Sequence, residues 1–404
     1  MKKKIIFINP HWNHLLMNTM MYYLFKIKAP AKYAIFFNEL IKREDVEIVA
    51  YVTPRGSIIP TDIHIPFKRN LAQKECKYIL KKNGFTNRIK FINSPDMATE
   101  NDVVIGFIHT KGGSDNLTSF KCRKILHLNQ FQCHSLKELK EILPYADEYI
   151  LEANVFKDNN YIIKASEHIK NNKIHILPFI VSNRFAMKTP FKKRKIKAIA
   201  TGTLARFTEK ENDYIKHYGT PYFHKMRKII YDNKSTLEKF IDCYISPYLE
   251  EKKIVNYQNW PQPFKSIGKI YYLLHSKPGQ QKNYFSFNIV EKYNEYQMAI
   301  VPEEIAGCPA IGAFEAMACG CAFIGIDHSM YKDIGLIPGI HYISYNGTLE
   351  DLIKKIEYYQ VHQDELEKIS SNGQAFINIH ARSSVIINQF IDIINGISAK
   401  STES

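Results

Sequence analysis

The sequence predicts an α/β protein made of two doubly wound domains, and three observations support this prediction. Short, almost wholly apolar runs alternate along the chain with segments of helical periodicity. Runs without polar alternation are typical of parallel strands that are buried on both faces. The 404 residues exceed one ordinary core, and the pattern restarts after a charged stretch at 188–195. Each half therefore reads as a series of βαβ units.

The first half contains seven predicted strands with helices between them. The strands are expected at 4–8, 46–52, 89–92, 103–108, 124–128, 148–151 and 174–178. Helical periodicity marks 31–43, 70–83 and 135–145. This order of elements is typical of a parallel sheet covered on both faces.

The second series begins after the charged stretch, with a strand expected at 196–201. Its later strands are predicted at 268–274, 298–301, 321–326 and 341–344, and its helices at 285–295, 309–319 and 348–359. The basic, aromatic stretch 207–265 is predicted to be an insertion, largely helical over 222–247. We therefore expect domains at 1–190 and 191–380, with a last helix in 381–404 that returns to the first domain.

The composition indicates an anionic partner. The chain has 55 Lys and Arg against 40 Asp and Glu, a net charge of +15. A phosphorylated substrate, an anionic membrane surface, nucleic acid or a composition bias could each account for it. Nucleic acid ranks last, because no helix-turn-helix, finger or RNA-binding aromatic motif accompanies the charge. A basic face is expected on the first domain from Lys68, Arg69, Lys81, Lys82, Lys121, Arg123 and Lys124.

Cysteine usage and hydropathy bear on the compartment. The seven cysteines form no CxxC pair, which favours reduced thiols in a cytoplasm and gives no zinc site. No apolar run of about 18 residues is present, so no membrane span is expected.

The stretch "GCPAIGAFEAMACG" (307–320) contains a single carboxylate, Glu315, in an otherwise uncharged helix. Pro309 fits the first helical position and Gly320 the position after the helix. The helix follows strand 298–301, so it begins at the sheet edge where open α/β sheets bind ligands. Its first N–H groups favour a phosphate, and a carboxylate further in can accept hydrogen bonds from two ribose hydroxyls. The alternative is a buried glutamate paired with backbone groups or a lysine.

The segment "FEAMACGCAFIGID" resembles the nucleotide-binding signature of glycosyltransferases with the GT-B fold. The likeness continues, in the right order, in "KAIATGTLAR" (197–206), "NIVEKYNEYQMAIVPEE" (288–304) and "GIHYISYNGTLEDLIKKI" (339–356). This resemblance implies two Rossmann-like domains facing a central cleft, with Glu315 on the ribose of a nucleotide sugar. The diphosphate is then expected over Gly307, Cys308, Ala310, Ile311 and Gly312, where the two glycines would let it approach the backbone.

Retaining members of the largest such family carry a further glutamate eight positions earlier. Here that position is Gly307, so Glu303 or Glu304 is the candidate, and retention or inversion stays open. The family places cations for the diphosphate after the first strand of the second domain and on a later loop. The cations matching these places are Arg206 and Lys210, then Lys277 or Lys282. Thr203, in the loop before Arg206, is also expected to contact the donor.

Histidines of the first domain are candidates for the reacting end of the sugar. His109 follows strand 103–108 and resembles the strand-ending histidine of the family, and His127 holds a similar place on the next strand. His11 and His14 are expected to contact the acceptor or to act as a base. The expected catalytic residues are therefore His109, Glu304 and Arg206.

The resemblance implies metal-independent transfer of a sugar from a nucleoside diphosphate donor to a hydroxyl acceptor, with no other cofactor. A glycan or lipid-linked glycan of bacterial capsule or lipopolysaccharide synthesis is the expected acceptor. We expect a cytoplasmic protein that associates peripherally with the inner membrane. The alternatives are a nucleotide-sugar epimerase or a phosphorylase of the same fold, or a non-catalytic nucleotide- or nucleic-acid-binding protein.

Overall fold

The structure is a computed structural model of the 404-residue chain. It describes residues 2–12, 15–16, 32–57, 59, 66–85, 88–108, 116–128, 131, 134–157, 163–164, 169, 174–207, 212–246, 260–261, 264–265, 267–268, 271 and 287–397.

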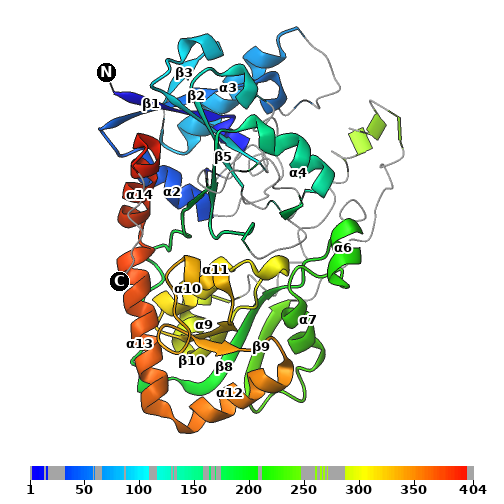
Figure 1. Cartoon of the computed structure of the whole chain (residues 1–404), viewed down its shortest axis with the longest axis vertical. Helices are drawn as coiled ribbons and strands as arrows, with labels where there is room; N and C mark the ends of the chain where they lie inside the picture. The colour runs from blue at the N-terminus through cyan, green and yellow to red at the C-terminus, as the bar shows by residue number, and fades with distance from the viewer. Residues whose placement is uncertain are drawn as a thin grey trace. The chain divides into compact units, whose positions relative to one another are not determined.

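The first sheet has seven strands in the order β3-β2-β1-β4-β5-β6-β7. Figure 1 labels β1, β2, β3 and β5 among them. They are β1 (Lys3–Ile8), β2 (Val46–Tyr51), β3 (Lys90–Ile92), β4 (Val103–Phe107), β5 (Arg123–His127), β6 (Glu148–Leu151) and β7 (Ile174–Ile176). The helices α2 (Lys32–Leu40), α3 (Lys68–Lys82) and α4 (Leu136–Ile142) lie between them in the chain. β1 pairs in parallel with β2 and β4. All seven predicted strands of this half are confirmed, and the strands in the middle of the sheet, such as β4, are buried along their whole length, as continuous apolar runs indicate.

The second sheet has five strands in the order β12-β11-β10-β8-β9, and every neighbouring pair is parallel. They are β8 (Lys195–Thr203), β9 (Ile241–Ser246), β10 (Tyr296–Ile300), β11 (Ala322–Ile326) and β12 (Ile343–Tyr345). The helices are α6 (Asn212–Tyr218), α7 (Lys225–Asp232), α9 (Ile289–Glu295), α10 (Ile311–Ala318), α11 (Ser329–Asp333), α12 (Leu349–Val361), α13 (Gln363–His380) and α14 (Ser383–Asn395).

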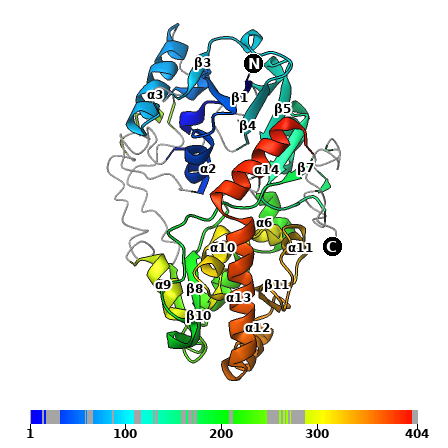
Figure 2. The same cartoon turned by 90° about the vertical axis from the view of Figure 1, so that its left-hand side faces the viewer.

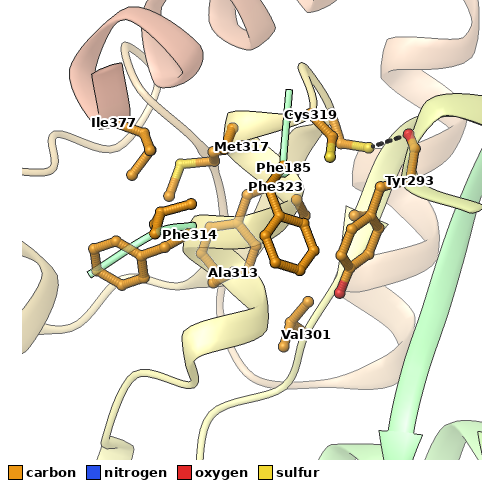
Figure 3. Close-up of a cluster of buried hydrophobic side chains, with 14 of the residues drawn as sticks. Phe185, Tyr293, Val301, Ala313, Phe314, Met317, Cys319, Phe323 and Ile377 are labelled. Atoms are coloured by element: carbon orange, nitrogen blue, oxygen red, sulfur yellow. Dashed lines mark hydrogen bonds between the residues drawn. The ribbon is translucent and has the colours of Figure 1, made fainter. Parts of the chain in front are cut away.

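Helices cover both faces of the second sheet. One core cluster joins α9, α10 and α13 with Phe179 and Phe185, which precede β8 (Figure 3). In it the ring of Phe314 on α10 meets Phe179 edge to face, with ring centroids 5.6 Å apart. A second cluster joins α7 and α12 with the start of α13 on the opposite face. Figure 2 shows α13 running beside α10. The doubly wound character expected of this half is therefore confirmed.

Two predictions in the second half are wrong. The stretch 222–247 was predicted to be largely helical, but it holds only the short α7 and then the edge strand β9. Side chains in the middle of β9 are only half-buried, so this strand lacks the continuous apolar run that marks the others. A strand was expected at 268–274, yet its described residues, Gly268 and Tyr271, are helical.

The chain divides into two compact units: strands β1 to β5 belong to the first, and the five-stranded sheet belongs to the second. The first comprises residues 1–131, 144–149 and 249–282, and the second comprises 132–143, 150–248 and 283–404. The two α/β domains expected from the sequence are confirmed as a fold class. No helix in the described ranges is both long and apolar enough to span a bilayer.

The basic face expected on the first domain is largely absent. Lys68 is 7% exposed, and Arg69 donates to the Val52 carbonyl at 3.2 Å. Arg123 donates to Glu148 at 2.8 Å, and Lys124 lies 3.1 Å from Asp147. Only Lys81, Lys82 and Lys121 of the predicted set are exposed. These cations lie close together in the sequence. In the structure most of them are buried or bonded to other groups of the unit, so they do not form one exposed basic face.

Candidate functional site

The strand order of the second sheet has a topological switch point between β8 and β10, and we use the word crevice below for the position outside the carboxyl ends of these two strands. The chain leaves β8 to form β9 on one side, then returns to form β10 on the other. Open α/β sheets bind ligands outside the carboxyl ends of the strands at such a switch point. Thr203 ends β8, and Val301 follows β10 at the same edge. Segment 203–206 at the end of β8 and segment 302–312 after β10 thus lie at the same edge of the sheet. These two segments contain the candidate site residues of the second unit that the structure describes and that precede Glu315 in the chain.

The α10 helix begins and ends with identifiable backbone signals. Ala310 is its N-cap residue and supplies no side-chain cap, so the prediction that Pro309 occupies the first helical position is wrong. Gly320, at φ +75°, donates its N–H to Met317 O at 2.8 Å, and Cys321 donates to Ala316 O at 3.0 Å. This Schellman ending confirms the place predicted for Gly320. The uncapped N-terminus leaves N–H donors and the positive end of the helix dipole at the crevice.

Packing inside the protein explains why glycine is needed at both position 307 and position 312. Gly307 has a φ of +76°, and a Cβ there would lie 2.7 Å from Nε2 of His328. A Cβ on Gly312 would lie 3.0 Å from the Val301 side chain. The space that these glycines leave is therefore filled by protein, and an anion would meet the backbone N–H groups instead. Between them, Cys308 and Ala310 are buried and Ile311 is half-buried.

Glu315 lies on α10 as a half-buried carboxylate. Within the described parts of the chain, its side chain makes no hydrogen bond and no ion pair. Burial raises the pKa of Glu315 to about 7, against a smaller opposing effect of the Arg184 guanidinium. The alternative of a glutamate satisfied by backbone groups or by a lysine thus finds no support among these residues. A carboxylate in this state can accept hydrogen bonds from a ligand.

The neighbouring glutamates Glu303 and Glu304 have different surroundings. Glu303 is buried, and its Oε1 accepts from the Tyr331 hydroxyl at 2.7 Å and from the Ile326 N–H at 2.9 Å. Burial also raises the pKa of Glu303. Glu303 therefore ties the end of β10 to β11 and α11. Glu304 is half-buried at the start of the loop helix Ile305–Gly307, which keeps it as the candidate for contact with the donor sugar.

A chain of backbone hydrogen bonds joins the loops that follow β8 and β10. Phe223 donates to Ala205 O at 3.0 Å, and Ile305 donates to Phe223 O at 2.6 Å. Residues 221–223 thus lie between the two loops and hold both. Arg206 is exposed, with its guanidinium 5.6 Å from the Tyr222 ring centroid. The expected diphosphate cation is therefore placed at the rim of the crevice.

Two buried side chains of the site were not predicted from the sequence. Nδ1 of His224 lies 2.9 Å from Pro302 O and 3.1 Å from Glu303 O. Because carbonyl oxygens only accept, this nitrogen carries the proton. Burial, reinforced by the nearby charge of Arg227, lowers the pKa of His224 to about 3. Arg227 donates to Thr203 O at 2.8 Å and covers Gly202, where a Cβ would lie 2.4 Å from its Cζ.

His224 and Arg227 therefore fix the carboxyl ends of both strands that form the switch point. Both come from the stretch 207–265, in which no motif indicated a role for any residue. Their partners are backbone carbonyls distant in the chain, a kind of contact that sequence patterns do not reveal. We regard them as positioning residues of the crevice.

We expect His224→Ala to lower the free energy of unfolding by about 1–3 kcal/mol near neutral pH, because two buried carbonyls lose their donor. The lowered pKa adds a test of its own. The unfolded histidine gains its proton as pH falls below 6.5, while the folded one stays neutral until about 3. This difference removes about 2 kcal/mol of wild-type stability between pH 6.5 and about 5. Urea unfolding at both pH values should show that the variant lacks this loss.

The control for this variant is Lys225→Ala, at the exposed next residue of α7. It should change neither the stability nor its pH dependence. Equal pH slopes for wild type and His224→Ala would contradict the buried neutral state of His224.

The other site residues expected from the sequence lie either in the first unit or outside the residue ranges that the structure describes. His11 is fully buried, with Nε2 2.8 Å from Gly56 O. His127 is buried and stacks on Phe107, with ring centroids 4.8 Å apart. Neither ring is exposed to a passing acceptor. Residues outside the described ranges are His14, His109, Lys210, Lys277 and Lys282.

Two parallel-sheet α/β units define the class of the protein as the GT-B fold, which glycosyltransferases of known structure share. Residues 259–392 match the family model described as "Glycosyl transferase-like". No curated protein matches the chain in sequence. The resemblance to GT-B glycosyltransferases inferred from the sequence is thereby confirmed, and a glycosyltransferase is the enzyme class that this match supports.

Solved structures agree over nearly the whole length. Anabaena Alr3699/HepE, solved with UDP-glucose, superposes with a TM-score of 0.55 at 11% identity, covering 97% of this chain and 99% of that one. Sucrose-phosphate synthase from Thermosynechococcus elongatus gives 0.53 at 12% identity, covering 99% and 100%. A glycosyltransferase from Rickettsia africae gives 0.51 at 14%, covering 99% and 100%. At such identities the likeness establishes the fold.

Proposed function

We propose that this protein transfers a sugar from a nucleoside diphosphate donor to a hydroxyl group of a glycan or lipid-linked glycan. The observation that carries the proposal is Glu315, a half-buried carboxylate on the helix that starts at the switch point, with no internal partner in the described structure. Ribose hydroxyls would supply the donors that this carboxylate lacks. The solved structures of HepE with UDP and with UDP-glucose support a donor of this chemical class.

The diphosphate is the leaving group, so its developing charge must be stabilised during transfer. The uncapped N-terminus of α10 offers N–H donors to it, and exposed Arg206 offers a guanidinium. Glu304 is the proposed contact of the donor sugar. Synthesis of a bacterial surface polysaccharide, such as capsule or lipopolysaccharide, is the proposed setting.

A thermal-shift series with UDP, GDP, CDP and CMP tests the donor site first. A nucleotide that binds the folded state stabilises it by mass action, by about 2.7 kcal/mol at 100 times its Kd. Release of the free nucleotide from its sugar conjugate, only when an acceptor is present, then identifies transfer. Conversion of the sugar without an acceptor would identify an epimerase, and a requirement for inorganic phosphate would identify a phosphorylase. A shift with no nucleotide would contradict the proposal.

We expect transfer activity to survive EDTA. The sequence contains no Asp-x-Asp motif to hold a donor-bound cation, and the proposed charge stabilisation comes from a helix terminus and arginine. The measurement is nucleotide release with and without EDTA. Loss of activity that Mg²⁺ restores would overturn metal independence while leaving the donor class standing.

A further inference from the structure

The loop that follows β10 is contacted at both of its ends by residues that follow β11. At the start of the loop, Glu303 accepts a hydrogen bond from the Tyr331 hydroxyl of α11 at 2.7 Å. Near its end, Gly307 lies against the imidazole of His328, which directly precedes α11. Glu304, the proposed contact of the donor sugar, lies between these two points in the chain. The start of α11 therefore frames the segment that presents Glu304.

The two ring nitrogens of half-buried His328 serve different contacts. Nδ1 accepts from the Met330 N–H at 3.2 Å, so His328 caps the first turn of α11. A nitrogen that accepts a hydrogen bond carries no proton, which places the ring proton of the neutral imidazole on Nε2. A Cβ on Gly307 would lie 2.7 Å from Nε2, 2.9 Å from Cδ2 and 3.0 Å from Cε1. The N–H edge of the ring therefore faces the loop.

The backbone of the loop is closed by two short-range hydrogen bonds. The Glu304 N–H donates to Cys308 O at 2.9 Å, and the Gly307 N–H donates to Glu304 O at 3.0 Å. Both bonds hold Glu304, and both depend on Gly307, whose φ is +76°. Glycine populates positive and negative φ about equally, so its own preference does not fix this turn. The His328 ring fills the space beside Gly307 and restricts the alternatives.

We propose that His328 is a positioning residue, which holds loop 304–308 in the conformation that brings Glu304 to the sugar of the donor. This inference rests on the proposed function, in which Glu315 binds the nucleoside and the start of α10 binds the diphosphate. The loop contact at Gly307 then affects only the part of the donor that Glu304 touches. His328 thus contributes to the affinity for a nucleotide sugar and not to the affinity for the free nucleoside diphosphate.

Two substitutions separate the contacts of the ring nitrogens. Asparagine is a favoured N-cap residue and keeps an acceptor close to the place of Nδ1, but its short side chain does not reach Gly307. Glutamine carries an amide N–H close to the place of Nε2 and lacks the short side chain of a favoured cap. We expect His328→Asn to keep the wild-type Tm and lose the loop contact. We expect His328→Gln to have a lower Tm and keep the contact.

Calorimetric titration with UDP, GDP and CDP, and with their glucose conjugates, measures the contribution to donor binding. His328→Asn should bind the conjugate about tenfold more weakly than the wild type, the loss of about one hydrogen bond, and the free nucleoside diphosphate within about twofold of it. His328→Gln should stay within about threefold of the wild type for both ligands. The control is His380→Asn at an exposed histidine of α13, which should match the wild type throughout.

A double-mutant cycle tests whether His328 acts through Glu304. Glu304→Gln should weaken binding of the conjugate selectively, as His328→Asn does. Because both changes remove one contact with the sugar, the combined variant should bind the conjugate no more weakly than Glu304→Gln alone. Losses that add would place His328 directly on the donor and would overturn its positioning role.

Amide hydrogen exchange in the unliganded protein tests the loop independently of any donor. The N–H groups of Glu304 and Gly307 should exchange faster in His328→Asn than in the wild type, and at the wild-type rate in His328→Gln. Unchanged exchange in His328→Asn, or an equal loss of affinity for the conjugate and the free nucleoside diphosphate, would overturn the inference alone. A wild type that binds none of these nucleotides would overturn the proposed function and the sugar contact together, while exchange still decides whether His328 holds the loop.

Discussion

Glu315→Gln is expected to weaken binding of the nucleotide donor by about 30-fold to 1,000-fold. The amide keeps the shape of the side chain but loses the charge, so two charge-assisted hydrogen bonds worth about 2–4 kcal/mol are lost. Transfer should fall at least as far. Calorimetric titration with the nucleotide that gives the largest thermal shift measures the binding, and nucleotide release measures the transfer.

The unliganded protein should respond in the opposite direction. Burial raises the pKa of Glu315 from its usual 4.5 to about 7 in the folded state, so folding favours the protonated form. The contribution of this group to stability therefore decreases as pH rises from about 4.5 through 7. Glu315→Gln has no charge to bury, so the unliganded variant should be about 1–3 kcal/mol more stable than the wild type at pH 8.

The pH dependence of donor binding gives a second arm of the test. Ribose hydroxyls donate best to the ionised carboxylate, so the affinity of the wild type should rise with pH through about 7. Glu315→Gln should show no such rise. The control is Glu357→Gln, an exposed residue of α12, which should match the wild type in both measurements. Unchanged donor affinity in folded Glu315→Gln would exclude Glu315 from the donor site.

Much of the fold could be predicted from the sequence, because buried parallel strands have a distinct pattern. The runs that became β4 and β10 are apolar at nearly every position, and β1 becomes apolar after its two lysines, as expected of strands inside a parallel sheet. The edge strand β9 was missed because it has a neighbouring strand, β8, on one side only, and its middle side chains are half-buried. An edge strand keeps polar side chains, here Asp242, and resembles a polar helical segment in sequence.

Candidate site residues could be predicted where they lie together in one short stretch of sequence. They could not be predicted where their role depends on partners that are distant in the sequence. Glu315 and Gly320 lie in one short stretch, and the resemblance of that stretch to the GT-B signature carries the prediction for Glu315. By contrast, His224 meets carbonyls 78 and 79 residues away, and Arg227 meets one 24 residues away. The structural role of Glu303 likewise comes from residues that are distant in the sequence, because Tyr331 and Ile326 donate hydrogen bonds to its carboxylate. Such roles need the fold itself.

The charged stretch at 188–195 gives another case in which the sequence does not reveal the partners of a side chain. Its composition predicts an exposed boundary between domains, and Lys192 and Lys193 are indeed exposed. Arg194 is only 4% exposed, and it donates to Thr189 O at 2.7 Å, to Gly320 O at 2.8 Å and to Cys319 O at 2.9 Å. It therefore binds the C-terminus of α10, where a cation complements the helix dipole.

Arg194→Met is expected to lower the free energy of unfolding by about 3–5 kcal/mol, because the buried carbonyl of Cys319 and the half-buried carbonyl of Thr189 lose their donor. The loss at Gly320 should be smaller, since its carbonyl also accepts from the Ser370 hydroxyl at 2.8 Å. Methionine retains an unbranched apolar side chain, so the effect reports mainly on the hydrogen bonds and the charge. Chemical denaturation measures it, with Lys193→Met as the exposed neighbouring control that should stay within about 0.5 kcal/mol of the wild type.

Arg194 acts at the C-terminal end of α10, opposite to the proposed donor site, which separates its role from the role proposed for Glu315. The folded fraction of Arg194→Met should therefore bind the nucleotide with the affinity of the wild type, while Glu315→Gln folds well and binds poorly. Two results would contradict this division. A loss of stability no larger than that of Lys193→Met would mean that water replaces the guanidinium at these carbonyls. A stable Arg194→Met protein with weakened donor binding would mean that the whole helix, and not only its N-terminal half, sets the geometry of the crevice.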